Sequence, residues 1–362
     1  MTQSPRHTFV IAEAGVNHNG DLDRAVALVK VAAEAGADAI KFQTFKADRI
    51  AAANAPKAAY QSRNTGDDGS QIAMLKALEL SDDDHRVLAA ASADSGIEFM
   101  STPFDEASAT FLVKDIGVKR LKIGSGELTN APLLLHLART DKPVILSTGM
   151  ATLDEVETAL GVLAFGYTGQ GAPSADAFAA AFAGNAGTAA VRDKVTLLHC
   201  TSDYPAAPET VNLAAMDTLA ETFRLPVGFS DHSQGIAIPA AAVARGAIAI
   251  EKHFTLDRML PGPDHKASLE PDELKAMIAS IRTVERAIGD AAKGPVAAER
   301  DTAAVARKSL VALTDISAGT PFSETNLGVK RPGTGVSPLE FWRYLGQTAA
   351  RDYARDELVD PQ

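Results

Sequence analysis

The sequence predicts an α/β fold in which an eight-stranded (β/α)₈ TIM barrel is followed by a small C-terminal domain. Two observations support this prediction. Eight short apolar runs recur along the chain, and each is usually followed by a stretch with helical periodicity. The chain also has 362 residues, which exceeds one average domain and leaves room for a second. A doubly wound parallel sheet is the alternative, but the glycine-rich first turn of such sheets is missing here.

The expected strands are short runs of apolar or β-branched residues, each bounded by a polar or glycine-bearing turn. Runs of this kind are typical of parallel strands that are buried on both faces. They are Phe9–Ala14, Ala39–Thr44, Glu98–Ser101, Arg120–Gly124, Val144–Ser147, Thr196–Cys200, Val227–Ser230 and Ala247–Lys252.

End signals support the helices between these strands. Thr152 stands three residues before Glu155, which is the spacing of a capping box. Gly36 follows an apolar stripe and is expected to end a helix. The clearest helix is expected between Pro271 and Gly289, because its apolar residues recur at spacings of three and four.

Two connections are longer than the others. Residues 45–80 follow the second strand and contain Tyr60, Arg63 and Gln71, so we consider this segment a lid over the site. Residues 164–193 are rich in alanine and glycine and are expected to form a peripheral loop or a small added helix.

The domain boundaries follow from these elements. Residues 1–289 are expected to form the barrel and 290–305 a polar, alanine-rich linker. Residues 306–362 are rich in turn signals and are expected to form a separate domain near the lower size limit for independent stability.

The composition excludes several classes of function. Acidic residues outnumber basic ones by 46 to 35, which gives a net charge of −11 and argues against nucleic-acid and membrane partners. The single cysteine, Cys200, excludes an internal disulfide and a CxxC redox pair. No signal peptide and no apolar run of membrane-spanning length is recognisable, so we expect a soluble, cytoplasmic protein with small-molecule substrates.

Polar residues gather at the expected C-terminal ends of the strands, where active sites of such barrels are built. Lys41 and Lys122 lie inside apolar runs and are costly to bury without a partner. Three interpretations stay open: an ion pair with Glu13 or Glu127, an anion site completed by serine hydroxyls and turn amides, or a Schiff-base lysine.

Histidines are the other candidates. His232 and His253 end adjacent expected strands, close enough for both imidazoles to bind one divalent ion. From spacing alone, a metal site and an ordinary hydrogen-bonded or acid–base role remain equally open. His18, His199 and His265 are further candidates for the pocket.

Motifs along nearly the whole chain carry a family resemblance. They include AEAGVNHNGDL at 12–22, IKFQTFKAD at 40–48, LKIGSGELTN at 121–130, GFSDHS at 228–233 and EKHFTLD at 251–257. These segments resemble the sialic acid synthase family, which includes N-acetylneuraminate, legionaminic acid and pseudaminic acid synthases. RKSLVA at 307–312 and VKRPGTG at 329–335 resemble the antifreeze-like (SAF, β-clip) domain that ends members of this family.

The resemblance implies an N-acetylneuraminate synthase, which condenses phosphoenolpyruvate with N-acetylmannosamine and water and releases phosphate by C–O cleavage. It also implies a divalent metal, Mn²⁺ or Mg²⁺, and a domain-swapped homodimer. The alternative is a legionaminic acid synthase that uses 2,4-diacetamido-2,4,6-trideoxymannose. More distant alternatives are a pyruvate-dependent Schiff-base aldolase and a non-catalytic carbohydrate- or ice-binding protein.

The resemblance also assigns roles to residues. Glu13 falls at the position of the catalytic carboxylate, and His232 and His253 fall at the metal-ligand positions, which are catalytic as well. The phosphoenolpyruvate contacts map to Lys41, Thr102, Lys122, Ser125, Ser147, Ser202 and Ser230. The sugar contacts map to Gln43, Glu127, Tyr204, Asp264 and Arg331, and Arg331 would come from the C-terminal domain of the other subunit.

Overall fold

The computed structural model describes residues 7–66, 69–169 and 171–361. The chain divides into two compact units, Met1–Gly289 and Asp290–Gln362. Residues 1–6, 67–68, 170 and 362, which fall within the predicted domains, lie outside the described residues.

The described part of the first unit contains an eight-stranded parallel sheet with the order β3-β2-β1-β8-β7-β6-β5-β4. The strands are β1 (Phe9–Gly15), β2 (Ala39–Thr44), β3 (Glu98–Pro103), β4 (Leu121–Ile123), β5 (Val144–Ser147), β6 (Val195–Cys200), β7 (Val227–Asp231) and β8 (Ala249–His253). β3 and β4, at the two ends of this order, lie against each other, so the sheet forms a nearly closed barrel. The predicted barrel is confirmed, and the doubly wound alternative is wrong.

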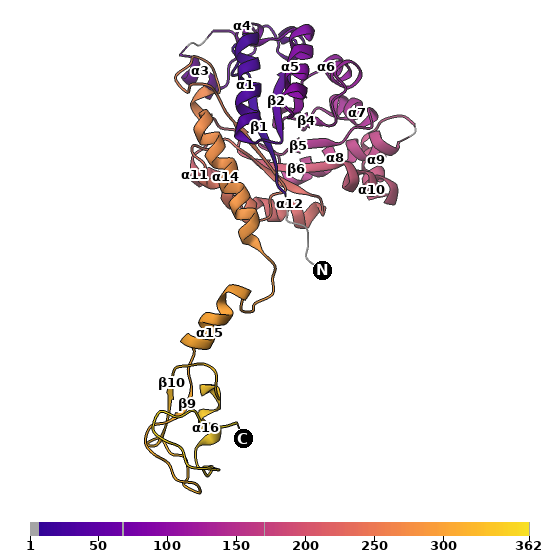
Figure 1. Cartoon of the computed structure of the whole chain (residues 1–362). Helices are drawn as coiled ribbons and strands as arrows, with labels where there is room; N and C mark the ends of the chain where they lie inside the picture. Colours follow the sequence, from indigo (N-terminus) through magenta and orange to yellow (C-terminus); the bar gives the residue numbers. More distant parts are fainter. Residues whose placement is uncertain (1–6, 67–68, 170, 362) are drawn as a thin grey trace. The chain divides into compact units, whose positions relative to one another are not determined.

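Helices cover the outside of the barrel (Figure 1). The main ones are α1 (Leu22–Ala35), α5 (Asp82–Asp94), α6 (Glu106–Phe111), α7 (Ala131–Arg139), α8 (Leu153–Thr168), α12 (Ala215–Phe223), α13 (Ala237–Ala244) and α14 (Pro271–Ile288). The capping box of Thr152 and Glu155 is confirmed at the start of α8. Gly36 ends α1 in the left-handed conformation, as predicted.

Side chains inside the barrel alternate with those that face the helices. An apolar cluster fills the interior toward the N-terminal ends of the strands. It comprises Ile11, Ala39, Met100, Ile145, Leu198 and Ala249, with Phe9 packed against it. The residues between these positions, such as Val10, Ile40 and Phe42, belong to the larger core shared with the helices.

The longer connections also form helices. Residues 45–80 carry α2 (Ala47–Ile50), α3 (Ala59–Thr65) and α4 (Gln71–Leu78). The alanine-rich segment forms two helices, α9 (Ala175–Ala183) and α10 (Asn185–Lys194), which pack beside α8 (Figure 1). The segment therefore contains more helix than the predicted loop or single small helix. Alanine strongly favours helix even where the sequence has no clear apolar stripe.

Short helices complete the description of the barrel unit. They are α11 (Pro208–Val211), the 3₁₀ turns η2 (Ser125–Glu127) and η3 (His265–Ala267), and the π-helical turn η1 (Leu112–Ile116). Within the described ranges, no helix of either unit is both long and apolar enough to cross a membrane.

The second unit is small and rich in turns. It contains the 3₁₀ turn η4 (Ala297–Glu299), α15 (Arg300–Ala306), β9 (Ser309–Ala312), β10 (Leu327–Lys330), the 3₁₀ turn η5 (Pro338–Glu340) and α16 (Phe341–Tyr344). β9 and β10 pair antiparallel around a core that includes Leu310, Phe322 and Tyr353. Part of the predicted linker is helical, and the backbone N–H of Gly333 donates to Ala304 O of α15 (2.8 Å).

Candidate active site

A cavity of about 690 Å³ opens at the C-terminal ends of the barrel strands. This volume suits a small-molecule substrate. All residues to which the family resemblance assigns a role, except Arg331, line it. They are Glu13, Lys41, Gln43, Thr102, Lys122, Ser125, Glu127, Ser147, Ser202, Tyr204, Ser230, His232, His253 and Asp264.

The strand geometry explains why these residues converge. Alternate residues of a strand point to the same face, so a polar residue two positions after an interior apolar one also points inward. On five strands the residue two positions after the apolar interior one is polar and lines the cavity. Glu13 follows Ile11, Lys41 follows Ala39, Thr102 follows Met100, Ser147 follows Ile145 and Glu251 follows Ala249.

The centre of the cavity floor holds two lysines and two glutamates, all buried. Lys41 forms an ion pair with Glu13, and its Nζ lies 3.7 Å from Glu251 Oε2. Lys122 Nζ lies 3.5 Å from Glu251 Oε1. The ion-pair interpretation of the lysines therefore describes this structure, but Glu127 is not a partner, because it accepts a hydrogen bond from Asn130 (2.6 Å).

Hydroxyl groups complete this charged centre. Lys41 Nζ donates to Thr102 Oγ1 (3.0 Å), and Lys122 Nζ donates to Ser147 Oγ (2.6 Å). Ser230 Oγ donates to Glu251 Oε1 (2.8 Å). These hydroxyls and ammonium groups are donors that an anion with several oxygens can use.

The two carboxyl groups differ in acidity. Burial raises the pKa of Glu13 to about 7, although Lys41 opposes this shift. Burial acts in the same direction on Glu251, but Lys122 and Lys41 outweigh it and lower the pKa of Glu251 to about 2. Glu251 therefore stays ionised at neutral pH, whereas Glu13 can exchange a proton.

The pKa values of the two lysines also shift in opposite directions. Burial lowers the pKa of Lys122, and Glu251 only partly opposes this effect. Burial alone would lower the pKa of Lys41 as well, but the carboxylates of Glu13 and Glu251 outweigh it and raise the pKa above its usual value. Lys41 is therefore the more firmly protonated cation.

His232 and His253 lie beside each other above this centre, with ring centroids 5.5 Å apart. His232 Nδ1 donates to Thr201 O (2.6 Å), which leaves Nε2 as a lone-pair donor. His253 Nδ1 is buried and has no hydrogen-bond partner among the described residues. Burial lowers the pKa of both imidazoles, so both are neutral near pH 7.

This pair fits a divalent metal ion. Neutral imidazole nitrogens are metal ligands, and the unpartnered Nδ1 of His253 is a buried atom that a metal would satisfy. Among the described residues, no group of three or more histidine, cysteine or acidic side chains is arranged to hold a metal. The two histidines would therefore leave coordination positions to water and substrate.

Gly15 is required at the end of β1. Its φ is +52°, and a Cβ there would lie 3.1 Å from Glu13 Oε1, 3.4 Å from His253 Cε1 and 3.6 Å from Gln43 Nε2. A side chain there would press on the Glu13 carboxyl group, touch His253 and Gln43, and strain the left-handed backbone. The glycine lets the carboxyl, imidazole and amide groups approach one another.

Residues of α3 line one side of the cavity. Tyr60 stacks on Tyr204 with ring centroids 4.8 Å apart. Asn64 Nδ2 donates to Tyr204 O (3.3 Å) and to Pro263 O (2.6 Å). Tyr60, Arg63 and Gln71 all line the cavity, and the role of this segment as a lid stays a prediction.

Four sequence candidates do not line this cavity. Arg331 lies in the second unit, exposed, and its Nε donates to Ala306 O (3.1 Å). The predicted pocket role of three histidines is wrong for this cavity, because their ring nitrogens bind elsewhere in the barrel unit. His18 bonds to Gly20 N (3.0 Å), His199 to Val211 O (2.7 Å) and His265 to Thr255 Oγ1 (2.8 Å).

Glu251 is the functional residue that the sequence-based candidate list misses. It contacts both lysines and Ser230. A signal was available, because Glu251 stands two residues before His253 in a predicted strand and must share its inward face.

The residues between these inward positions form a second buried pair. Asp231 and Lys252 are directly opposite each other on β7 and β8, and their side chains are fully buried. Lys252 Nζ lies 2.6 Å from Asp231 Oδ2 and also donates to Ser233 O. This pair ties together the two strands that carry the histidines.

Residues 28–293 match the sequence profile of the NeuB family, and residues 307–362 match that of the SAF domain. The chain is 46% identical to N,N'-diacetyllegionaminic acid synthase of Campylobacter jejuni, over 98% of this chain and 99% of the relative. It is 48% identical to the enzyme of the same name from Legionella pneumophila, over 93% of this chain and 89% of the relative.

The chain is also similar to a solved structure. The N-acetylneuraminic acid synthetase of Leptospira borgpetersenii, crystallised with citrate, matches with a TM-score of 0.66 and 34% identity. The match covers 83% of this chain and 92% of that protein.

Proposed function

The chain belongs to the NeuB family, and we propose that it condenses phosphoenolpyruvate with 2,4-diacetamido-2,4,6-trideoxymannose and water to give N,N'-diacetyllegionaminate and phosphate. N-acetylmannosamine, the first choice from sequence alone, is the second candidate sugar. The two legionaminic acid synthases at 46% and 48% identity support the trideoxy sugar, since the sialic acid synthetase reaches 34%.

One structural observation carries the proposal. Lys41, Lys122, Glu13, His232 and His253 converge on a single cavity at the strand ends. Two cations and several hydroxyl donors suit an anionic substrate, and a carboxyl group that exchanges protons near neutral pH suits the addition of water. A pure binding site for a neutral sugar would not need these groups together.

The anion comes first in the mechanism. We assign the phosphoenolpyruvate phosphate and carboxylate to Lys41, Lys122 and the hydroxyls of Thr102, Ser125, Ser147, Ser202 and Ser230. Glu251 keeps both ammonium groups in place when the anion is absent. Because these donors are already oriented, they can stabilise negative charge without rearranging.

We assign the sugar to the space above the anion, with its aldehyde near the two histidines. Gln43, Glu127, Tyr204 and Asp264 line this level of the cavity and are assigned to the sugar. His232 and His253 would hold Mn²⁺ or Mg²⁺, which as a Lewis acid supplies polarisation of the aldehyde oxygen when bound.

The reaction then proceeds by C–O cleavage. C3 of phosphoenolpyruvate attacks the aldehyde carbon, and the new alkoxide takes a proton, for which Asp264 is our candidate donor because burial raises its pKa to about 6. Water adds to the cationic C2 and gives its proton to Glu13. The bond between C2 and the phosphate oxygen breaks, the C2 hydroxyl becomes the ketone of the product, and its proton leaves with inorganic phosphate. Glu13 then loses and Asp264 regains a proton by exchange with solvent.

Phosphate release from phosphoenolpyruvate with manganese and each sugar tests this proposal. We expect turnover with both sugars and a higher kcat/KM for the trideoxy sugar. Release of phosphate with neither sugar would overturn the proposed function.

The lowered pKa of Lys122 favours one other reaction, a pyruvate aldolase that forms a Schiff base. Reduction with borohydride in the presence of pyruvate distinguishes the two, since only a Schiff base is trapped as a covalent adduct. We expect no adduct, because Lys122 is already engaged with Ser147, Ile123 O and Glu251.

We also propose a homodimer in which Arg331 of the partner subunit contacts the N-acyl group of the sugar. The family resemblance and the match of residues 307–362 to the SAF domain support this proposal. Arg331 is exposed in its own unit, so its guanidinium is accessible to a second chain.

A further inference from the structure

We infer that an apolar wall on one side of the cavity selects the sugar by the groups at its C4 and C6 positions. The wall consists of Val16, Phe45, Ile50, Met74, Leu75 and Phe104, and all six side chains line the cavity. The inference rests on the proposed function and deepens it. It identifies side chains that make the chain prefer a sugar with an acylamino group at C4 and a methyl group at C6.

The two candidate sugars differ at these two carbons. N-acetylmannosamine carries hydroxyl groups at C4 and C6. The trideoxy sugar carries an acetamido group and a methyl group instead, so it presents two additional methyl groups. A wall without hydrogen-bonding side chains favours these methyl groups and leaves the C6 hydroxyl of N-acetylmannosamine without a partner. The amide N–H and C=O at C4 would face the polar side of the cavity or water.

The wall is a continuous packed surface. Val16 and Phe45 are buried, and Ile50, Met74, Leu75 and Phe104 pack against them while remaining partly exposed. The rings of Phe45 and Phe104 meet edge to face, with centroids 6.0 Å apart. The only heteroatom in these six side chains is the methionine sulfur, which is a weak acceptor.

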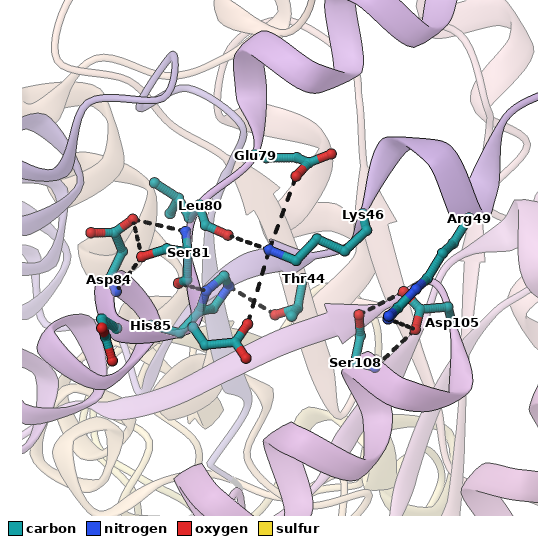
Figure 2. A network of polar contacts seen from close by, with 12 residues as sticks. Thr44, Lys46, Arg49, Glu79, Leu80, Ser81, Asp84, His85, Asp105 and Ser108 are labelled. Carbon is teal, nitrogen blue, oxygen red and sulfur yellow. Dashed lines mark hydrogen bonds and ion pairs between the residues drawn. The ribbon is translucent and has the colours of Figure 1, made fainter. Parts of the chain in front are cut away.

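A polar network holds the segment that carries the wall (Figure 2). Lys46 lies between Glu79 (4.0 Å) and the backbone oxygen of Leu80 (3.4 Å), and Arg49 pairs with Asp105 (3.3 Å) (Figure 2). Asp105 in turn accepts from Ser108 N (2.9 Å). The wall is thus fixed to the barrel and is preformed for a ligand.

α2 and α4 are also joined directly. Asp48 of α2 pairs with Lys76 of α4 (2.8 Å), and Ala47 N donates to Glu79 Oε1 (2.6 Å). These contacts keep Ile50 and Met74 at one rim of the cavity. A change of one of these side chains therefore alters the surface that the sugar meets.

The rest of the cavity is chemically different. The loops after β4 and β6 contribute Ser125, Glu127, Ser202 and Asp203, which carry hydroxyl or carboxylate groups. The anion and the aldehyde are assigned to the polar floor and the histidines. The apolar end of the sugar is then best matched by the wall, because a hydroxyl-bearing end would find its partners on the polar side.

The test compares kcat/KM for the trideoxy sugar with that for N-acetylmannosamine in the Met74→Gln variant. Glutamine has nearly the length of methionine but introduces an amide. Loss of one or two methyl contacts in an apolar pocket changes discrimination by about tenfold. We expect the preference for the trideoxy sugar to fall by about that factor, with most of the loss in the kcat/KM of that sugar.

Two controls accompany this variant. Met74→Leu keeps the wall apolar and should keep the ratio. Met259→Gln makes the same chemical change at a methionine that is 87% exposed and does not line the cavity, so it should also leave the ratio unchanged. If Met74→Gln melts at a lower temperature than the parent chain, Ile50→Thr tests the wall from α2 instead.

The outcomes separate this inference from the proposed function. Phosphate release with both sugars but an unchanged ratio in Met74→Gln and Ile50→Thr overturns the wall and leaves the function standing. A preference of the parent chain for N-acetylmannosamine also overturns the wall. No release with either sugar overturns the function itself.

Discussion

Glu13 and Glu251 contact the same lysine, yet their pKa values move in opposite directions. Glu251 has a second lysine and a serine hydroxyl as partners, and these hold its negative charge. Glu13 forms an ion pair with Lys41, but the effect of burial dominates and the pKa of Glu13 rises to about 7. The arrangement provides one permanent anion and one proton acceptor from the same residue type.

Replacing Glu13 with glutamine should slow turnover and spare binding. The amide keeps the shape of the side chain but cannot accept the proton of the attacking water, so we expect kcat to fall by about 10²–10⁴-fold. Phosphate release measures kcat, and calorimetry measures the affinity for phosphoenolpyruvate. Glu157→Gln, on the exposed side of α8, is the matched control, and equal activity of the two variants would contradict the role of Glu13.

Asp264 should make the stability of the barrel dependent on pH. Burial raises its pKa to about 6, above the value near 4 of an unfolded chain. As pH rises from about 4 to 6 the unfolded state loses this proton first, so the carboxyl reduces the free energy of unfolding progressively over that window. This penalty is present in full above pH 6 and absent below pH 4.

The Asp264→Asn variant removes this penalty. We expect the free energy of unfolding to rise by about 2 to 3 kcal/mol at pH 8 and by less at pH 5, while turnover of the sugar falls. Urea unfolding at the two pH values measures the difference. A gain that is larger at pH 5 than at pH 8 would contradict the assignment.

At the residue scale, most of the polar residues that line the cavity could be predicted. The ends of the strands, and the alternation of inward and outward side chains along them, are visible in the sequence. Glu251 is not among the predicted site residues, although its position two residues before His253 on β8 places it on the same inward face. His18, His199 and His265 could not be placed, because the direction of a loop side chain depends on contacts such as that of His265 with Thr255.

At the scale of elements, the Asp231–Lys252 pair joins β7 and β8 on the side away from the cavity. Asp231→Asn leaves Lys252 charged, fully buried and without its counter-ion, which should reduce the free energy of unfolding by about 3 to 5 kcal/mol.

The double variant Asp231→Leu and Lys252→Met tests whether the unpaired charge of Lys252 causes the loss of unfolding free energy. It leaves no buried charge, so we expect it to be more stable than Asp231→Asn. Urea unfolding of the three chains gives the comparison. A double variant that is less stable than the single one would show that the hydrogen bonds to Ser233, and not the charge, dominate.

Elements differed in how well they could be predicted. The barrel strands were clear because both faces are buried and the runs are continuous, and helices with caps, such as α8 and α14, were equally clear. α9 and α10 were harder, because Ala175–Ala183 has no alternation of polar and apolar faces that marks a packed helix. Their packing beside α8 depends on tertiary contacts that periodicity does not encode.

At the scale of the whole molecule, the proposed sharing of sites between subunits can be tested by mixing inactive chains. Glu13→Gln disables the barrel unit, and Arg331→Ala disables the proposed sugar contact of the second unit. After the two variants are unfolded and refolded together, half of the dimers are mixed and each has one intact site. We therefore expect phosphate release to recover to about one quarter of the parent rate.

The variants refolded separately are the control for this experiment. If Arg331 served the barrel of its own chain, every site in a mixed dimer would carry one defect. The mixture would then be no more active than the two variants alone, which would contradict the shared site.

The apolar layer of Ile11, Met100, Ile145 and Leu198 fills the interior of the barrel below the charged centre. This layer fills the far end of the interior, so the cavity opens at the C-terminal ends of the strands and does not continue through the barrel. Whatever occupies the bottom must enter first and leave last. Under the proposed function, phosphoenolpyruvate would bind before the sugar, and the sugar acid would leave before inorganic phosphate. The filled barrel would then set the order of binding and release.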